Sequence, residues 1–290
     1  MKMSVELLDI AELDLQAAKV LHENELYPQS IFYFQQSVEK ANKAFALMTK
    51  LVTEDQLLRD IRHEPIRIYE KVIIKQKNKF EQFEGHLRII PGFKEINILK
   101  NIDVNNYLKQ FDIFLSDIEE IKQDRNDLIN MSFTDIRRIL REIEFNRKNS
   151  EKQMRRISKI RVTERDWNKQ KTNMIELYNV FSKYNPVQVE KEKKNLDNIN
   201  IEQIEEYIKR YFEFIYFVTF ISTPLYYLSI ITLPHSTVTR YPQNDLTPVN
   251  IYTKKLPIVK KLPVLSEIQG RALKELKILN KRIEDLNVTK

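Results

Sequence analysis

Arg125, Asn126 and Asn130 stand close together in the stretch DRNDLINMSF, residues 124–133. An arginine guanidinium carries five N–H donors in a planar fork that matches a pair of phosphate oxygens. Asparagine amides donate and accept hydrogen bonds, but they do not titrate near neutral pH and therefore cannot move protons. These side chains could hydrogen-bond a phosphate or a base, but the amides could not move a proton. The alternative is that an arginine–asparagine pair occurs here by chance.

Two other arginine–histidine pairs could also bind an anion or transfer a proton. Arg62 and His63 come just before Pro65, and His235 and Arg240 lie in a proline-bounded stretch. Imidazole is the side chain whose ordinary pKa lies nearest neutral pH, so a histidine beside an arginine could serve a phosphate site. Packing at helix ends is the alternative for the first pair. For the second, the alternatives are a helix cap at His235 and a carboxylate partner for Arg240.

The composition excludes several other chemistries. The 290 residues include no cysteine, which rules out disulfides, thiolate zinc sites and cysteine nucleophiles. The 3 glycines cannot form a Rossmann fingerprint, and no phosphate-binding G-x-x-x-x-G-K-[ST] loop is present. No histidine lies within helical reach of another, so an H-E-x-x-H metal site is absent. We therefore expect no cofactor and no metal.

The net charge of +7 is concentrated in one segment. Residues 137–165 contain 11 Lys/Arg and 4 Glu, which gives +7, while the rest of the chain has 37 of each sign. Such a segment could contact RNA phosphates with salt-sensitive affinity. An ordinary solvated helix surface is the alternative.

Apolar residues recur at helical spacing through most of the chain, and no clear period-two alternation stands out, which predicts an all-α fold. The first two runs, 5–18 and 31–48, flank a short break and predict an antiparallel hairpin. Thr53 is expected to cap a third helix that Pro65 interrupts, and Pro263 is expected to open the last helix. We expect connections at 83–103, 187–199 and 235–262. The uncharged run 214–234 has the length of a membrane span, but Pro224 and its polar residues favour a buried core helix.

The first hairpin also carries a polar pattern inside an aromatic helix. In DLQAAKVLHENELYPQSIFYFQQSVEKANKAF, a Q-Q-x-x-E-K-A-x-K pattern places Gln35, Gln36, Glu39, Lys40, Ala41 and Lys43 on the second helix. This stretch resembles the HEPN family (higher eukaryotes and prokaryotes nucleotide-binding). The stretch IRHEPIRIY, the TRYP element at Thr239–Pro242 and the final helix resemble later parts of the same family.

The resemblance implies a HEPN-like antiparallel helical bundle with inserted helices. It predicts HEPN-like N-terminal helices at 1–80, a helical insertion at 81–200 that carries the basic segment 137–165, and C-terminal helices at 201–290 that complete the bundle. Many family members resemble metal-independent ribonucleases with an R-x(4–6)-H motif, often R-N-x-x-x-H. None of His22, His63, His86 and His235 has an arginine at that spacing. Asn130 stands where the motif has histidine, so the motif is degenerate.

The implied function is RNA or nucleotide binding in a toxin–antitoxin or defence setting. The candidate contacts are Arg125, Asn126, Asn130, Arg62, His63, His235 and Arg240. One alternative is an active metal-independent endoribonuclease that uses His63 or His235, and another is a helical protein–protein interaction module without nucleic acid. The resemblance also implies a homodimer and a nucleotidyltransferase-like or antitoxin partner. The acidic N-terminal stretch shows no targeting segment, so we expect a cytoplasmic protein without a membrane anchor.

Overall fold

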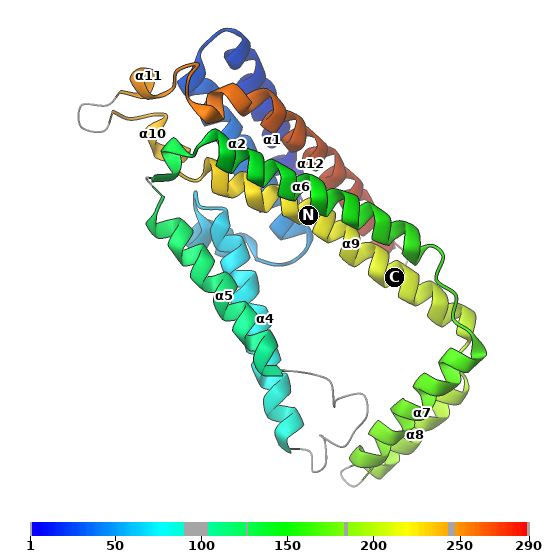
Figure 1. The fold of residues 1–290 in the computed structure, drawn as a ribbon. Helices are drawn as coiled ribbons and strands as arrows, with labels where there is room; N and C mark the ends of the chain where they lie inside the picture. The colour runs from blue at the N-terminus through cyan, green and yellow to red at the C-terminus, as the bar shows by residue number, and fades with distance from the viewer. Residues whose placement is uncertain (1, 90–103, 126, 183–184, 243–246, 289–290) are drawn as a thin grey trace. The chain divides into compact units, whose positions relative to one another are not determined.

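The computed structural model describes residues 2–89, 104–125, 127–182, 185–242 and 247–288. Its elements are helices, and the described residues form no strand, which confirms the all-α prediction. The helices are α1 (Lys2–Glu23), α2 (Tyr27–Met48), α3 (Glu54–Gln56), the π-helix η1 (Leu57–Ile61), α4 (Ile66–Ile89), α5 (Val104–Gln123), the 3₁₀ helix η3 (Asp127–Asn130), α6 (Phe133–Ile157), α7 (Glu164–Phe181), α8 (Pro186–Asp197), α9 (Ile201–Thr232), α10 (His235–Val238), α11 (Pro248–Ile251) and α12 (Pro257–Val288) (Figure 1).

The chain divides into two compact units, which we describe separately. The first contains residues 1–73, 114–148 and 218–290, and the second contains residues 74–113 and 149–217. The first unit thus joins the start, the middle and the end of the chain. These bounds differ from the predicted domain bounds, and they divide the basic segment 137–165 between the units. The assignment of 81–200 as an inserted domain remains a prediction.

Helices α1, α2 and α12 pack against one another in the first unit (Figure 1). Helices α1 and α2 approach closely at small residues. The hydroxyl groups of Ser30 and Ser37 donate hydrogen bonds of 2.7 Å to the Ala18 and Ala11 carbonyls. Gln269 of α12 donates in turn to the Ser37 hydroxyl at 3.1 Å. The predicted hairpin is therefore present, and the last helix packs against both of its helices.

The last helix begins earlier than predicted. Helix α12 starts at Pro257 rather than Pro263, which lies inside it. A proline inside a helix leaves the carbonyl four residues earlier without its usual N–H partner. Here the carbonyl of Val259 hydrogen-bonds His22 Nε2 at 2.9 Å, so α1 supplies the missing partner.

Other element predictions were met in part. Thr53 caps α3 in a capping box with Gln56, as expected. All three expected connections are partly helical: α4 continues through residues 83–89, and α8 occupies most of 187–199. Helices α10 and α11 and the start of α12 lie within 235–262. Residues 90–103 of the expected loop lie outside the described residues.

Helix α9 fits the expected buried core helix only in its C-terminal half. Ile221, Leu225 and Leu228 are fully buried, whereas Tyr211 and Phe214 are exposed. Among the described helices, α9 is long and apolar enough to cross a membrane by length and composition, with 33% of its most apolar window buried. The core helix of a soluble protein passes the same test.

Candidate functional site

Arg125 lies just after α5 and joins two distant segments of the first unit. Its Nη1 donates to Glu64 Oε1 at 3.1 Å, and its Nη2 donates to Ser236 Oγ at 2.5 Å. Glu64 precedes α4, and Ser236 is in α10. The side chain of Arg125 keeps 27% of its surface exposed, so part of the guanidinium still faces solvent.

Arg240, just after α10, binds the same serine. Its Nε and Nη2 donate to the Ser236 carbonyl oxygen at 3.1 and 2.9 Å. Its guanidinium carbon also lies 5.3 Å from the centre of the Phe32 ring and 5.5 Å from that of Tyr241. Ring contacts and a forked hydrogen bond fix the orientation of this cation. Arg125 and Arg240 are therefore held on the two oxygens of one residue.

The charges around Ser236 do not balance. Glu64 also accepts a hydrogen bond from Arg67 Nε at 2.5 Å, so it is shared between two arginines. Arg240 has no carboxylate partner among the described residues. Two guanidinium groups, those of Arg125 and Arg67, thus bind the Glu64 carboxylate, while that of Arg240 binds the Ser236 carbonyl. The charge of Arg67 also acts on Glu119, whose pKa is lowered mainly by its hydrogen bonds to Lys122 and Gln123. We call Arg67, Arg125, Arg240, Glu64 and Ser236 the arginine cluster; an electropositive, partly exposed group of this kind favours an anionic ligand.

Arg62 and His63 follow the π-helix η1 in the same unit. Arg62 has a φ of 48°, in the left-handed region where residues with a side chain are uncommon, and its Nε donates to the Arg59 carbonyl at 3.2 Å. His63 Nδ1 lies 3.2 Å from Glu39 Oε1, and 73% of its side chain is exposed. A carboxylate at Nδ1 favours the tautomer that leaves Nε2 free toward solvent.

Glu39 is the buried anchor of this pair. It is 3% exposed on α2, and it accepts hydrogen bonds from Lys43 Nζ at 2.7 Å and Gln35 Nε2 at 3.1 Å. Glu39 and Lys43 stand four residues apart on α2 and form an ion pair. Gln35 and Glu39 are both buried, so this polar pattern is not a solvated face.

His235 is enclosed rather than exposed to a ligand. It is 1% exposed, and its Nδ1 lies 2.7 Å from the hydroxyl of Tyr252. Burial lowers the pKa of His235 to about 3, because a charged ring would lose its hydration. The ring is therefore neutral at physiological pH. It does not act with Arg240 as a proton donor to a ligand.

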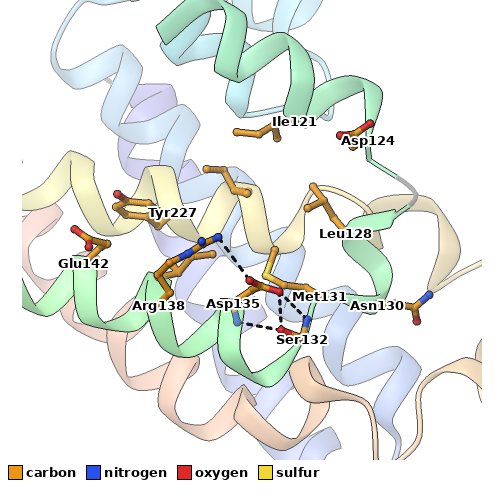
Figure 2. Close-up of a pocket in the computed structure, with 12 residues that line it drawn as sticks. Ile121, Asp124, Leu128, Asn130, Met131, Ser132, Asp135, Arg138, Glu142 and Tyr227 are labelled. Carbon is orange, nitrogen blue, oxygen red and sulfur yellow. Dashed lines mark hydrogen bonds and ion pairs between the residues drawn. The ribbon is translucent and has the colours of Figure 1, made fainter. Parts of the chain in front are cut away.

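The remaining candidates are the asparagines. Asn126 lies outside the described residues. Asn130 ends η3, is exposed, and lines a pocket of about 560 Å³ whose lining does not include Arg125 (Figure 2). The structure therefore brings Arg125 and Arg240 together on Ser236, and Arg125 does not line the pocket that Asn130 lines. Within the described residues no group of His, Asp or Glu could hold a metal ion.

Sequence reasoning did not identify Glu64, Ser236 or Phe32 as partners in the site. Glu64 follows the quoted pair Arg62-His63, and Ser236 lies in the stretch between His235 and Arg240. Proximity to the candidate residues was the only signal available, because a contact across about a hundred residues leaves no trace in local spacing.

Comparisons with known proteins bear on the first part of the chain. Residues 4–77 match the HEPN domain family. A stretch of 86 residues is 33% identical to "Putative toxin MJ1304" of Methanocaldococcus jannaschii, and it covers 30% of this chain and 52% of that protein. The match thus spans about half of the relative's length. No solved structure matches the chain. The HEPN match over residues 4–77 confirms the resemblance that the pattern in the first hairpin predicted.

Proposed function

We propose that this protein is a toxin-type HEPN protein that binds RNA at the arginine cluster. The observation that carries the proposal is the convergence of Arg125 and Arg240 on the two oxygens of Ser236, with Glu64 as the one carboxylate of the cluster. The family match and the relative that is named a toxin support the setting.

The physical argument rests on exchange of partners. A phosphate group can replace the neutral oxygens of Ser236 as the acceptor for both guanidinium forks, and its charge makes each hydrogen bond stronger. Such contacts release counterions from RNA, so the affinity should fall as salt rises. Because both arginines are already fixed by Ser236, less side-chain entropy is lost on binding.

The test is a titration of a fluorescein-labelled single-stranded RNA followed by anisotropy. Arg125→Gln and Arg240→Gln should each weaken binding by about tenfold, the loss of about 1.4 kcal/mol expected for a charge-assisted contact. Arg59→Gln is the matched control, because Arg59 also carries one positive charge but lies outside the cluster and is 79% exposed. Equal losses in all three variants would point to unspecific attraction and against this site.

A second candidate function is cleavage of RNA by His63, without metal. The observation that favours it is the orientation of an exposed imidazole by the buried Glu39 carboxylate. With Nδ1 held, Nε2 can take the proton of a 2′-hydroxyl, whose oxygen then attacks the adjacent phosphorus while an arginine stabilises the developing phosphate charge. The bond from phosphorus to the 5′-oxygen breaks, and the leaving 5′-oxygen takes a proton from water or from the imidazolium. Incubation with RNA in a chelator should then give products that carry a 2′,3′-cyclic phosphate.

His63→Gln decides between the two functions. If the protein cleaves, His63→Gln abolishes the products while RNA affinity and the Arg59→Gln control stay at the wild-type level. If wild-type protein binds RNA and leaves it intact, binding alone stands. If wild-type protein neither binds nor cleaves RNA, both functions fail. The alternative of a protein–protein interaction module that does not bind nucleic acid is then the better account.

The assembly is also part of this proposal. Family resemblance suggests a homodimer in the cytoplasm that is neutralised by an antitoxin. Light scattering on the purified protein tests the dimer, which would have twice the chain mass of 34.9 kDa. A mass of 34.9 kDa at micromolar concentration would contradict it.

A further inference from the structure

The pocket of about 560 Å³ is formed entirely within the first unit. It lies between the end of α5, η3, the start of α6 and the C-terminal half of α9 (Figure 2). A pocket of this volume accommodates a small ligand or one long side chain. It is a different site from the arginine cluster, because neither Arg125 nor Arg240 lines it.

One part of its wall is apolar. The side chains that form this part are Ile121, Leu128, Met131, Ile139 and Ile230, with the ring of Tyr227 beside them. Several of them also pack on a core of buried residues that includes Ile118 and Leu233. This wall is therefore backed by the core and suits an aliphatic or aromatic group.

The polar part of the pocket is acidic in an otherwise basic chain. Asp124 and Glu142 line it, and neither carboxylate has an ion-pair partner among the described residues. The third acid, Asp135, accepts a hydrogen bond of 2.6 Å from the Ser132 hydroxyl and lies 3.6 Å from Arg138 Nη2. Arg138 offsets Asp135, so the lining keeps about two negative charges.

Two features show that this charge acts inside the pocket. Burial, and then the negative charge of Glu142, raise the pKa of Tyr227. Arg138, whose side chain is 74% exposed, extends its guanidinium toward Asp135, as Figure 2 shows. Arg138 thus forms an ion pair with Asp135 at the pocket wall, and Asp124 and Glu142 remain for another cation.

We propose that this pocket binds an alkyl cation, that is, an ammonium or guanidinium group on an aliphatic stem. The stem would pack on the apolar wall, and the charged head would reach Asp124 or Glu142, in the manner in which lysine and arginine side chains place their stems and heads. The Tyr227 ring offers a further contact for the cation. A phosphate-bearing ligand does not fit, because the unpaired carboxylates would repel it.

The first test uses a matched pair of probes, n-butylguanidinium and its uncharged analogue n-butylurea. Binding is followed through the ¹³C-labelled methyl group of Met131, assigned with Met131→Leu. We expect saturable binding of n-butylguanidinium that is at least about tenfold tighter than that of n-butylurea, because one head is a cation beside carboxylates. Guanidinium without a stem should bind about tenfold more weakly than n-butylguanidinium, because it buries no apolar surface. Equal binding of the charged and uncharged probes would overturn the proposal.

The second test removes the acids without changing their shapes. The double variant Asp124→Asn/Glu142→Gln should lose the preference for n-butylguanidinium over n-butylurea. Asp9→Asn/Glu120→Gln removes two charges at exposed positions of the same unit that do not line the pocket, and it should keep the preference. An unchanged preference in the pocket variant, or an equal loss in the control, would overturn the proposal. Unshifted methyl resonances of the other methionines check that both variants fold.

Two sources could supply this chemistry, namely a free polyamine or a basic side chain of a polypeptide. Spermidine and the peptide acetyl-Leu-Arg-Leu-amide represent them. The tighter binder identifies the source, provided that its affinity falls in the pocket variant and not in the control. If neither competes with n-butylguanidinium, the proposal fails. None of these outcomes depends on RNA binding, so this proposal and the proposed function can fail separately.

Discussion

Burial decides what the histidines of this chain can do. His63 and His235 both stand beside an arginine in the sequence, but one imidazole is 73% exposed and the other is enclosed with Tyr252. Charging an enclosed ring is unfavourable because the charged form loses its hydration, whereas an exposed ring keeps it. Of these two rings, the one that a ligand can reach from solvent is therefore that of His63.

His235 should make the stability of the fold depend on pH. Its folded pKa of about 3 lies below the ordinary value of about 6.5, so the unfolded chain binds one more proton between these values. The stabilisation is complete above pH 6.5 and is lost as pH falls toward 3. We expect the free energy of unfolding to fall by about 1 kcal/mol per pH unit below pH 6 from this group.

Urea unfolding of wild-type protein and His235→Gln at pH 7 and pH 5 measures this effect. The difference in stability between the two proteins should shrink at pH 5, since the variant has no ring to protonate. A difference that is the same at both pH values would contradict the assignment of His235 as a buried neutral ring.

The residues of the site were predictable by type but not by partner. Arg125, Arg240 and His63 followed from side chains able to bind phosphate or move protons. That Arg125 meets Arg240 rather than Asn130 depends on α10 lying beside the turn after α5, which is a tertiary contact. Local spacing cannot encode it.

At the scale of elements, a buried hydrogen-bond network connects α9 to α2 of the first hairpin and to α4. The Tyr69 hydroxyl of α4 lies 2.7 Å from Asn42 Oδ1 and 3.3 Å from the Ser222 carbonyl. Asn42 Nδ2 donates to the Leu225 carbonyl at 3.3 Å. A polar group in such a network is costly to leave unsatisfied.

Tyr69→Phe should therefore lower the free energy of unfolding by about 1–3 kcal/mol, since it leaves the buried Asn42 oxygen without its donor. Tyr207→Phe is the control, because Tyr207 is 70% exposed. Chemical denaturation of both variants is the measurement. A loss below that of the control would show that the network contributes nothing.

Substitution of Gly270 should raise the free energy of unfolding rather than lower it. It lies in the interior of α12, where glycine is less favourable than alanine, and an added Cβ would meet Leu15 Cδ2 at 3.6 Å, an ordinary contact. Gly270→Ala should raise the free energy of unfolding by about 0.5–1 kcal/mol. Destabilisation in the same denaturation assay would mean that α12 and α1 pack more closely than described.

Helix existence was predictable where the apolar period was regular, and helix ends were predictable where a cap was present. The Thr53 cap is an example of the second kind. The predicted start of α12 at Pro263 was wrong. The sequence does not show that His22 hydrogen-bonds the Val259 carbonyl, which lets the helix continue through this proline. The π-helix η1 was also missed, since its widened turn has no simple residue signature.

At the scale of the whole molecule, distant parts of the chain form one compact unit, and the site arises where they meet. Residues 1–73, 114–148 and 218–290 belong to this unit, and each part contributes to the arginine cluster: Arg67 and Glu64 come from the first, Arg125 from the second, and Ser236 and Arg240 from the third. A binding surface of this kind exists only when the unit is folded.

RNA affinity should also depend on salt in proportion to the phosphate contacts. The logarithm of affinity plotted against the logarithm of salt concentration has a slope of about −0.7 per contact on single strands. Because both arginines are proposed to hold one phosphate, Arg125→Gln/Arg240→Gln should make the slope less negative by about 0.7 in anisotropy titrations. An unchanged slope would place the contacts elsewhere, with the exposed basic residues of 137–165 as the next surface to test.

The most direct test of the shared site is a double-mutant cycle on RNA affinity with Arg125→Gln, Arg240→Gln and the double variant. If both arginines hold the same phosphate, the double variant should lose less than the sum of the two single losses, with a coupling free energy of about 0.5–3 kcal/mol. Single losses that add fully, or wild-type affinity in all three variants, would contradict the account.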